Sequence, residues 1–114
     1  MIEIYGIPTC NSCKKARTWC TQHEIDFTWQ DLRKEPPSIE QVKAWVQSLS
    51  AKPLRNTSGG SYRALGEEKK EWSDTQWTEA FAADPMLLKR PILVVDSVAQ
   101  TTGFRAEAWE ALLL

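Results

Sequence analysis

Residues 2–13, IEIYGIPTCNSC, join a short apolar run to two cysteines in a C-x-x-C pair. The run from Ile2 to Ile7 predicts a β-strand, and residues 11–24, which contain neither Gly nor Pro, predict the helix that follows. Cys10 then falls at a helix N-terminus, where free N–H groups and the positive end of the helix dipole would stabilise a thiolate. Cys13, one turn further on, could attack a mixed disulfide on Cys10.

A zinc site is one alternative for these cysteines, because Cys20 and His23 follow and complete the spacing C-x2-C-x6-C-x2-H. On one continuous helix, however, Cys13 and Cys20 lie roughly 10 Å apart, at about 1.5 Å per residue. A metal held about 2.3 Å from each sulfur does not span that distance. We therefore predict no metal site, a packed core thiol at Cys20 and a surface imidazole at His23. An inert pair of buried cysteines stays open as a second alternative.

The composition limits the class of protein. A length of 114 residues suits one domain, residues 1–114, with its own core. The net charge of −1 disfavours nucleic acid and anionic membranes as partners, since both select basic surfaces. No apolar run has the length of a membrane span, so we expect a cytoplasmic protein, and we expect a monomer. Three cysteines in a reducing compartment indicate catalysis, metal binding or redox sensing rather than a disulfide framework.

Beyond the cysteines, Ile25, Phe27 and Trp29 alternate with polar residues, which is the period of a second strand. The resulting β-α-β unit implies two parallel strands. A helical insert of about 38–90 follows, with an expected helix at 38–49 capped by Ser38 and Gln41, a loop at 50–61, a solvated charged run at 67–71 and a helix after the capping box at 73–76. A strand at 92–95, a turn at 96–97, a strand at 99–102 and a helix at 104–114 complete the chain. The six tryptophans are expected to pack in the core.

A β-α-β unit that opens with C-x-x-C, followed by a β-β-α unit entered through a proline, resembles the thioredoxin-like fold. This is an α/β fold with a mixed four-stranded sheet flanked by helices. Four motifs have the order and spacing of the arsenate reductase (ArsC)-like family: Pro8-Thr9-Cys10-Asn11-Ser12-Cys13-Lys14-Lys15-Ala16, Pro53-Leu54-Arg55-Asn56, Leu88-Lys89-Arg90-Pro91-Ile92 and Gly103-Phe104-Arg105. The resemblance covers nearly the whole chain and is greatest to the Spx/YffB-type branch, within it to the YffB-type proteins.

The resemblance implies which residues carry the chemistry. The family's nucleophilic cysteine falls on Cys10, and its three arginines, which hold an oxyanion or a thiolate, fall on Arg55, Arg90 and Arg105. Arginine suits this role because its planar guanidinium stays charged and can donate two parallel hydrogen bonds to an anion.

Further expected site residues surround this set. The proline after the second arginine, Pro91, is usually cis in this fold and would present a backbone edge to the substrate. Asn11, Ser12 and Lys14 are the other expected substrate-binding residues. Cys13 is the expected second catalytic thiol, which either resolves the mixed disulfide on Cys10 or forms a protective disulfide with it.

The resemblance implies an oxidoreductase without a bound cofactor: a thiol reductase that exchanges disulfides at Cys10 with glutathione as co-substrate. The substrate would be a small thiol, a disulfide or an oxyanion. One alternative is an arsenate reductase that uses glutathione and glutaredoxin. The other is a redox-sensing regulator, like Spx, that binds RNA polymerase through a Cys10–Cys13 switch. Arsenate reductases of the family usually lack a counterpart of Cys13, which favours the thiol reductase.

Overall fold

The computed structural model describes residues 1–114 and is organised around a four-stranded sheet in the order β2-β1-β3-β4. The strands are β1 (Ile2–Gly6), β2 (Thr28–Asp31), β3 (Ile92–Val95) and β4 (Val98–Thr102). β1 pairs in parallel with β2 and antiparallel with β3, which pairs antiparallel with β4. Helix α1 (Asn11–Gln22) connects the two parallel strands, and α6 (Ala106–Leu113) follows β4. This mixed sheet with flanking helices confirms the predicted thioredoxin-like fold.

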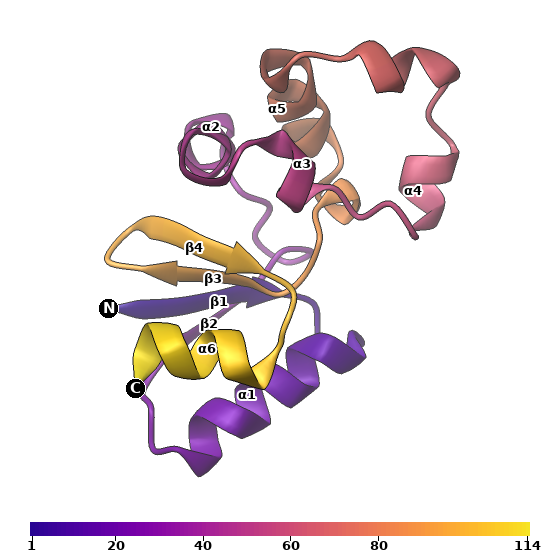
Figure 1. Cartoon of the computed structure of the whole chain (residues 1–114). Coiled ribbons are helices and arrows are strands. Elements are labelled where there is room, and N and C mark those ends of the chain that lie inside the picture. Colours follow the sequence, from indigo (N-terminus) through magenta and orange to yellow (C-terminus); the bar gives the residue numbers. More distant parts are fainter.

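Helices cover both faces of the sheet (Figure 1). α1 and α6 lie on one face, and α2 (Ile39–Leu49) lies on the other with the rest of the helical insert. Because successive strand residues point to opposite faces, Ile4 and Leu93 face α1 and α6, whereas Tyr5 and Ile92 face the insert. Each face therefore has its own hydrophobic core.

The smaller core, here named the α1/α6 cluster, consists of six buried residues: Ile4, Ala16, Trp19, Cys20, Leu93 and Trp109. The larger core, the insert cluster, contains Trp45, Leu54, Trp77 and Phe81 among its fifteen buried members. Four of the six tryptophans are buried and the other two, Trp29 and Trp72, pack against these cores. The expectation of core tryptophans is confirmed.

The insert contains more short helices than the sequence predicted. Besides α2, its elements are α3 (Ala51–Leu54), α4 (Gly60–Arg63), the 3-10 helix η1 (Glu67–Glu71), α5 (Asp74–Ala83) and the 3-10 helix η2 (Pro85–Leu87). The prediction of a loop at 50–61 was therefore wrong at both of its ends. In the 67–71 run, Lys69 is only 7% exposed because its ammonium donates to the Leu65 carbonyl (3.3 Å) and lies 4.7 Å from the centre of the Tyr62 ring. No helix of the structure is both long and apolar enough to cross a membrane.

The two predicted caps differ in detail. Ser73 and Gln76 form a complete capping box at the start of α5. At α2 only half of the box forms, because Ser38 accepts from the backbone of Gln41 (3.1 Å) whereas the Gln41 side chain donates to the Tyr5 hydroxyl (2.8 Å). This glutamine thus links α2 to the sheet.

The second strand begins later than its alternating pattern predicted. β1 starts at Ile2, and the parallel ladder begins where Glu3 pairs with Thr28, so Ile25 and Phe27 lie outside it. Both side chains still pack against the α1/α6 cluster. The alternation therefore identified the buried side of the segment but not the bounds of the strand.

Candidate active site

Cys10 is the N-cap residue of α1, as the sequence predicted. Its backbone is extended (φ −83°, ψ 123°), and its carbonyl accepts the first helical hydrogen bond, from Lys14 (3.0 Å). The Cys10 sulfur accepts a hydrogen bond from the backbone N–H of Cys13 (3.4 Å). The side chain is half-buried against the insert cluster and is not part of a disulfide. A reacting sulfur at this place faces the free N–H groups and the positive end of the helix dipole.

Cys13 lies one turn further along α1 and is completely buried. Its burial, and next its hydrogen bond to Cys10, raise the pKa of the Cys13 thiol well above the ordinary value, with the charge of Arg90 acting in the opposite direction. The sulfur fits against β1 because residue 6 is glycine: a Cβ atom at Gly6 would lie 2.4 Å from it. The pair is thus asymmetric, with an accessible sulfur at Cys10 and a protonated, enclosed one at Cys13.

Cys20 and His23 do not join these thiols. Cys20 is fully buried in the α1/α6 cluster, whereas His23 is exposed and caps the C-terminal end of α1, with its Nδ1 2.9 Å from the Trp19 carbonyl oxygen. Both placements match the sequence predictions. No three His, Cys, Asp or Glu side chains gather in a way that could hold a metal ion.

Arg90 precedes a cis peptide bond to Pro91, the isomer expected from the family resemblance. Its guanidinium is held by two backbone carbonyls, since Nη1 donates to Met86 (3.2 Å) and to Leu88 (3.0 Å). Its Nε is buried and has no hydrogen-bond partner in the chain. Pro91 is itself buried at the start of β3. Arg90 is therefore fixed in position and keeps donor capacity for a ligand or water.

Backbone pairing between distant segments brings Arg55 beside the segment that precedes Arg90. It follows α3 and forms an isolated antiparallel bridge with Leu88; on either side, Asn56 donates to the Leu87 carbonyl and Lys89 to the Leu54 carbonyl (both 2.8 Å). The guanidinium carbon of Arg55 lies 4.5 Å from the centre of the buried Trp77 ring. Its Nε, like that of Arg90, is buried without a partner. An aromatic face rather than a carboxylate thus supports this cation.

Arg105 is exposed at the N-cap of α6 and lines a cavity of about 210 Å³ together with Arg90 and Ser12. None of the three predicted arginines forms an ion pair: the two salt bridges of the chain join the N-terminal amine to Asp96 and Lys70 to Glu67. Lys89 lines the same cavity and was given no role by sequence reasoning, although it lies inside one of the recognised motifs. Lys89 is identified as a candidate site residue by its place in a cavity that is lined by cations and by no carboxylate.

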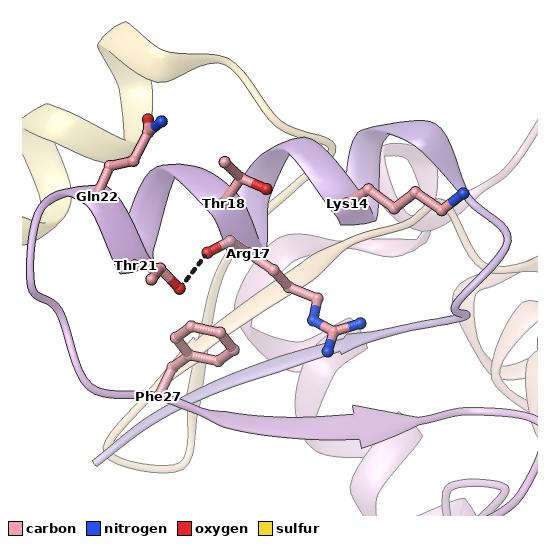
Figure 2. Close-up of a pocket in the computed structure, with 6 residues that line it drawn as sticks. All are labelled: Lys14, Arg17, Thr18, Thr21, Gln22 and Phe27. Atoms are coloured by element: carbon pink, nitrogen blue, oxygen red, sulfur yellow. Dashed lines mark hydrogen bonds between the residues drawn. The ribbon is translucent and has the colours of Figure 1, made fainter.

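The remaining predicted site residues lie at the start of α1 and face different surroundings. Asn11 and Ser12 are exposed in its first turn. Lys14 lines a separate shallow groove of about 400 Å³ on the outer side of the helix (Figure 2). That groove also contains Arg17, Thr18, Thr21, Gln22 and Phe27, and no cysteine. The structure therefore brings Ser12, Arg90 and Arg105 around one cavity. The other predicted site residues do not line it: Cys10, Asn11, Cys13, Lys14, Arg55 and Pro91.

Comparisons with known proteins agree with this geometry. The family model described as "ArsC family" matches residues 5–112. Among curated relatives, the uncharacterized protein YusI of Bacillus subtilis (strain 168) is 34% identical over 96% of this chain and 95% of its own length. The global transcriptional regulator Spx of Lactiplantibacillus plantarum is 32% identical over 82% of this chain and 73% of its own.

Solved structures give the same assignment. The structure titled "YFFB (PA3664) protein" superposes with a TM-score of 0.91 at 28% identity and covers both chains completely. A structure described as "a possible arsenate reductase" from Streptococcus mutans UA159 gives a TM-score of 0.88 at 33% identity, covering 100% of this chain and 98% of the other. With the family model matched over nearly the whole length, and with the C-x-x-C helix start and cis-Pro91 in place, the chain belongs to the ArsC family.

Proposed function

We propose that this protein is a glutathione-dependent thiol reductase with Cys10 as its nucleophile. The observation that carries the proposal is the position of Cys10: a half-buried sulfur at a helix N-cap, backed by an enclosed second thiol at Cys13. Thiol–disulfide exchange needs a thiolate as the attacking group and an accessible path to it. The three arginines without carboxylate partners supply charge for an anionic substrate or leaving thiolate.

The proposed reaction begins when the Cys10 thiolate attacks one sulfur of a disulfide. A new sulfur–sulfur bond forms at Cys10, the substrate bond breaks, and the other half leaves as a thiolate that takes up a proton. A glutathione thiolate then attacks the substrate sulfur of the mixed disulfide, which frees the Cys10 thiolate and gives a glutathione–substrate mixed disulfide. A second glutathione thiolate attacks the glutathione sulfur of that mixed disulfide and releases the substrate thiolate, so that two glutathione molecules supply two electrons and leave as oxidised glutathione. In this scheme Arg55, Arg90 and Arg105 hold the anionic groups.

Cys13 offers a second route out of the mixed disulfide. Charge on the Cys10 sulfur is one of the causes that raise the pKa of Cys13, after burial. That charge is lost once Cys10 is bonded to a substrate sulfur, so Cys13 becomes easier to ionise at that stage. Attack by Cys13 would then release the bound thiol and leave a Cys10–Cys13 disulfide for glutathione to reduce.

The test is glutathione-dependent reduction of a disulfide by the unmodified protein and by Cys10→Ser and Cys13→Ser variants. We expect Cys10→Ser to abolish the reaction. Activity retained by Cys10→Ser would refute the proposal. If Cys13 resolves the intermediate, Cys13→Ser accumulates a glutathione adduct on Cys10 that is visible by mass; if it does not, the variant turns over normally.

An arsenate reductase is a second candidate, favoured by the same arginines and by the similarity to the Streptococcus mutans structure. The Cys10 thiolate would attack arsenate, and glutathione with glutaredoxin would resolve the adduct and supply the electrons. The measurement is arsenite formation with both reductants present. No arsenite above the uncatalysed background would exclude this function.

A redox-sensing regulator is a third candidate, favoured by the similarity to Spx. A disulfide between Cys10 and Cys13 would span one helical turn and change the surface around the start of α1. This candidate predicts that a pull-down retains the C-terminal domain of the RNA polymerase α subunit in only one redox state. Absence of binding in both states would exclude it.

A further inference from the structure

All the charged side chains that line the cavity around Ser12, Arg90 and Arg105 are cationic. Its charged lining residues are Lys89, Arg90 and Arg105, and no aspartate or glutamate lines it. Neither cysteine lines the cavity, but Ser12, which lies between the two cysteines in sequence, forms part of its wall, so the cavity adjoins the first turn of α1. Its volume of about 210 Å³ is smaller than the roughly 300–1,000 Å³ of pockets that enclose whole ligands. The size suits one charged arm of a substrate.

The neutral part of the lining is ordered by contacts with the rest of the chain. Trp109 is fully buried, and its indole N–H donates to the Gly103 carbonyl (3.2 Å). The Thr102 hydroxyl donates to the Pro53 carbonyl (2.6 Å), whereas the Thr101 hydroxyl makes no hydrogen bond within the chain. Thr101 is therefore free to donate to an anion.

Lys89 is held at this cavity by its backbone and by a neighbouring glycine. Its N–H donates to the Leu54 carbonyl (2.8 Å), which anchors the residue between α3 and β3. Gly103 has φ of +77°, and a Cβ atom built there would lie 3.2 Å from Cε and 3.7 Å from Nζ of Lys89. The lysine side chain thus occupies the space beside a residue that has no side chain. Its ammonium is not engaged by any carboxylate of the chain.

We propose that this cavity binds a carboxylate of the thiol or disulfide that reacts at Cys10, with Lys89 as a direct binding residue beside Arg90 and Arg105. The inference rests on the proposed thiol–disulfide exchange and adds the place where the carboxylate binds and Lys89 as a further binding residue. Three cations without internal counter-ions leave the empty site electrostatically unbalanced, and a bound carboxylate offsets that charge. The buried Nε of Arg90 and the free hydroxyl of Thr101 are neighbouring donors for the same group.

The test compares three disulfides that differ in charge: oxidised glutathione (anionic), hydroxyethyl disulfide (neutral) and cystamine (cationic). In a Cys13→Ala background, which prevents resolution, mass spectrometry follows the rate of adduct formation on Cys10 at low salt. We expect the rates to fall in the order given. We expect Lys89→Met to slow only the reaction with oxidised glutathione, by about three- to fivefold, the upper part of the range for one solvent-exposed charge pair.

Two further variants distinguish binding at the cavity from a general effect of positive charge on the protein. Lys15→Met removes the same charge from an exposed position of α1 outside the cavity and should leave all three rates within about twofold, the margin for a screened surface charge. Lys89→Arg keeps the charge and should retain most of the preference for oxidised glutathione. Equal slowing of all three disulfides by Lys89→Met, or no slowing with oxidised glutathione, would overturn the inference alone. No adduct on Cys10 with any disulfide would instead overturn the proposed function.

Discussion

Replacing Gly6 by alanine tests how closely Cys13 is packed against the sheet. An added Cβ would lie 2.4 Å from the Cys13 sulfur and 3.1 Å from Cη2 of Trp29. Gly6 lies within β1 and does not have a positive φ, so alanine fits the backbone and the cost comes from contact alone. Because Cys13 is fully buried in the first turns of α1, its sulfur has little room to move away.

The magnitude follows from two opposing effects. Overpacking in a closed core costs about 1–3 kcal/mol, and a contact this short belongs at the upper end. Alanine in place of glycine also restricts the unfolded chain, which returns about 0.4–1 kcal/mol. We therefore expect Gly6→Ala to lower the free energy of unfolding by about 2 kcal/mol. Urea denaturation of the reduced protein measures this change.

A double-mutant cycle identifies the contact responsible. Cys13→Ala removes the sulfur and leaves the Cys13 Cβ 3.4 Å from the new atom, which is close to an ordinary contact. The double variant should therefore lose at least about 1.5 kcal/mol less than the sum of the two single losses, within the range seen for residues in contact. Losses that add to within about 0.5 kcal/mol would refute the packing explanation.

Three other predictions concern the thiols and Arg55. In the native protein at neutral pH, iodoacetamide should label Cys10 and spare Cys13 and Cys20, because Cys13 and Cys20 are fully buried and burial raises the pKa of each thiol. Peptide mass spectrometry identifies the labelled cysteines, and labelling of Cys20 before unfolding would contradict this prediction. Burial raises the pKa of Cys20 to about 11 from 9.0, so the unfolded thiol ionises first and the free energy of unfolding should fall as pH rises from about 9 to about 11. Cys20→Val should flatten that decline in urea titrations at successive pH values, and an unchanged slope would show that other groups cause it. Finally, Trp77→Phe should slow adduct formation on Cys10 by oxidised glutathione about threefold in the Cys13→Ala background, because its cation–π contact with Arg55 is weaker, while the rate with hydroxyethyl disulfide stays unchanged. Equal effects on both disulfides would indicate a general loss of structure.

Much of the fold could be predicted because its signals are local. The run Ile2–Ile7, the uninterrupted helical stretch after it and the complete cap at Ser73 each depend on residues a few positions apart, and all three are present in the structure. The errors arose where pairing between distant segments sets the bounds of an element. β2 starts at Thr28 because its ladder with β1 begins at the pair Glu3–Thr28, and no pattern within residues 25–31 contains that information.

Helix α3 and the start of α4, which lie in the predicted loop at 50–61, were missed for a related reason. α3 and α4 have four residues each, too few to show a helical period in the sequence. Their stability comes from packing: Ala51 and Leu54 of α3 are fully buried in the insert cluster. Lys69 was predicted to be solvent-exposed because charged runs usually are. In the structure its ammonium contacts the Tyr62 ring and a backbone carbonyl, and the residue is buried.

The sequence alone determined that Cys10 would cap a helix, because strand, turn and helix signals lie within a dozen consecutive residues. Only the tertiary structure decided which distant residues lie together. Arg55 meets the segment before β3 through backbone pairing across more than thirty residues, and Ser12, Lys89 and Arg105 converge on one cavity from three separate parts of the chain. The burial of Cys13, and hence its raised pKa, likewise depends on α1 packing against Gly6 in β1. Charge placement and desolvation are properties of the packed chain, so they become visible only when distant segments are brought together.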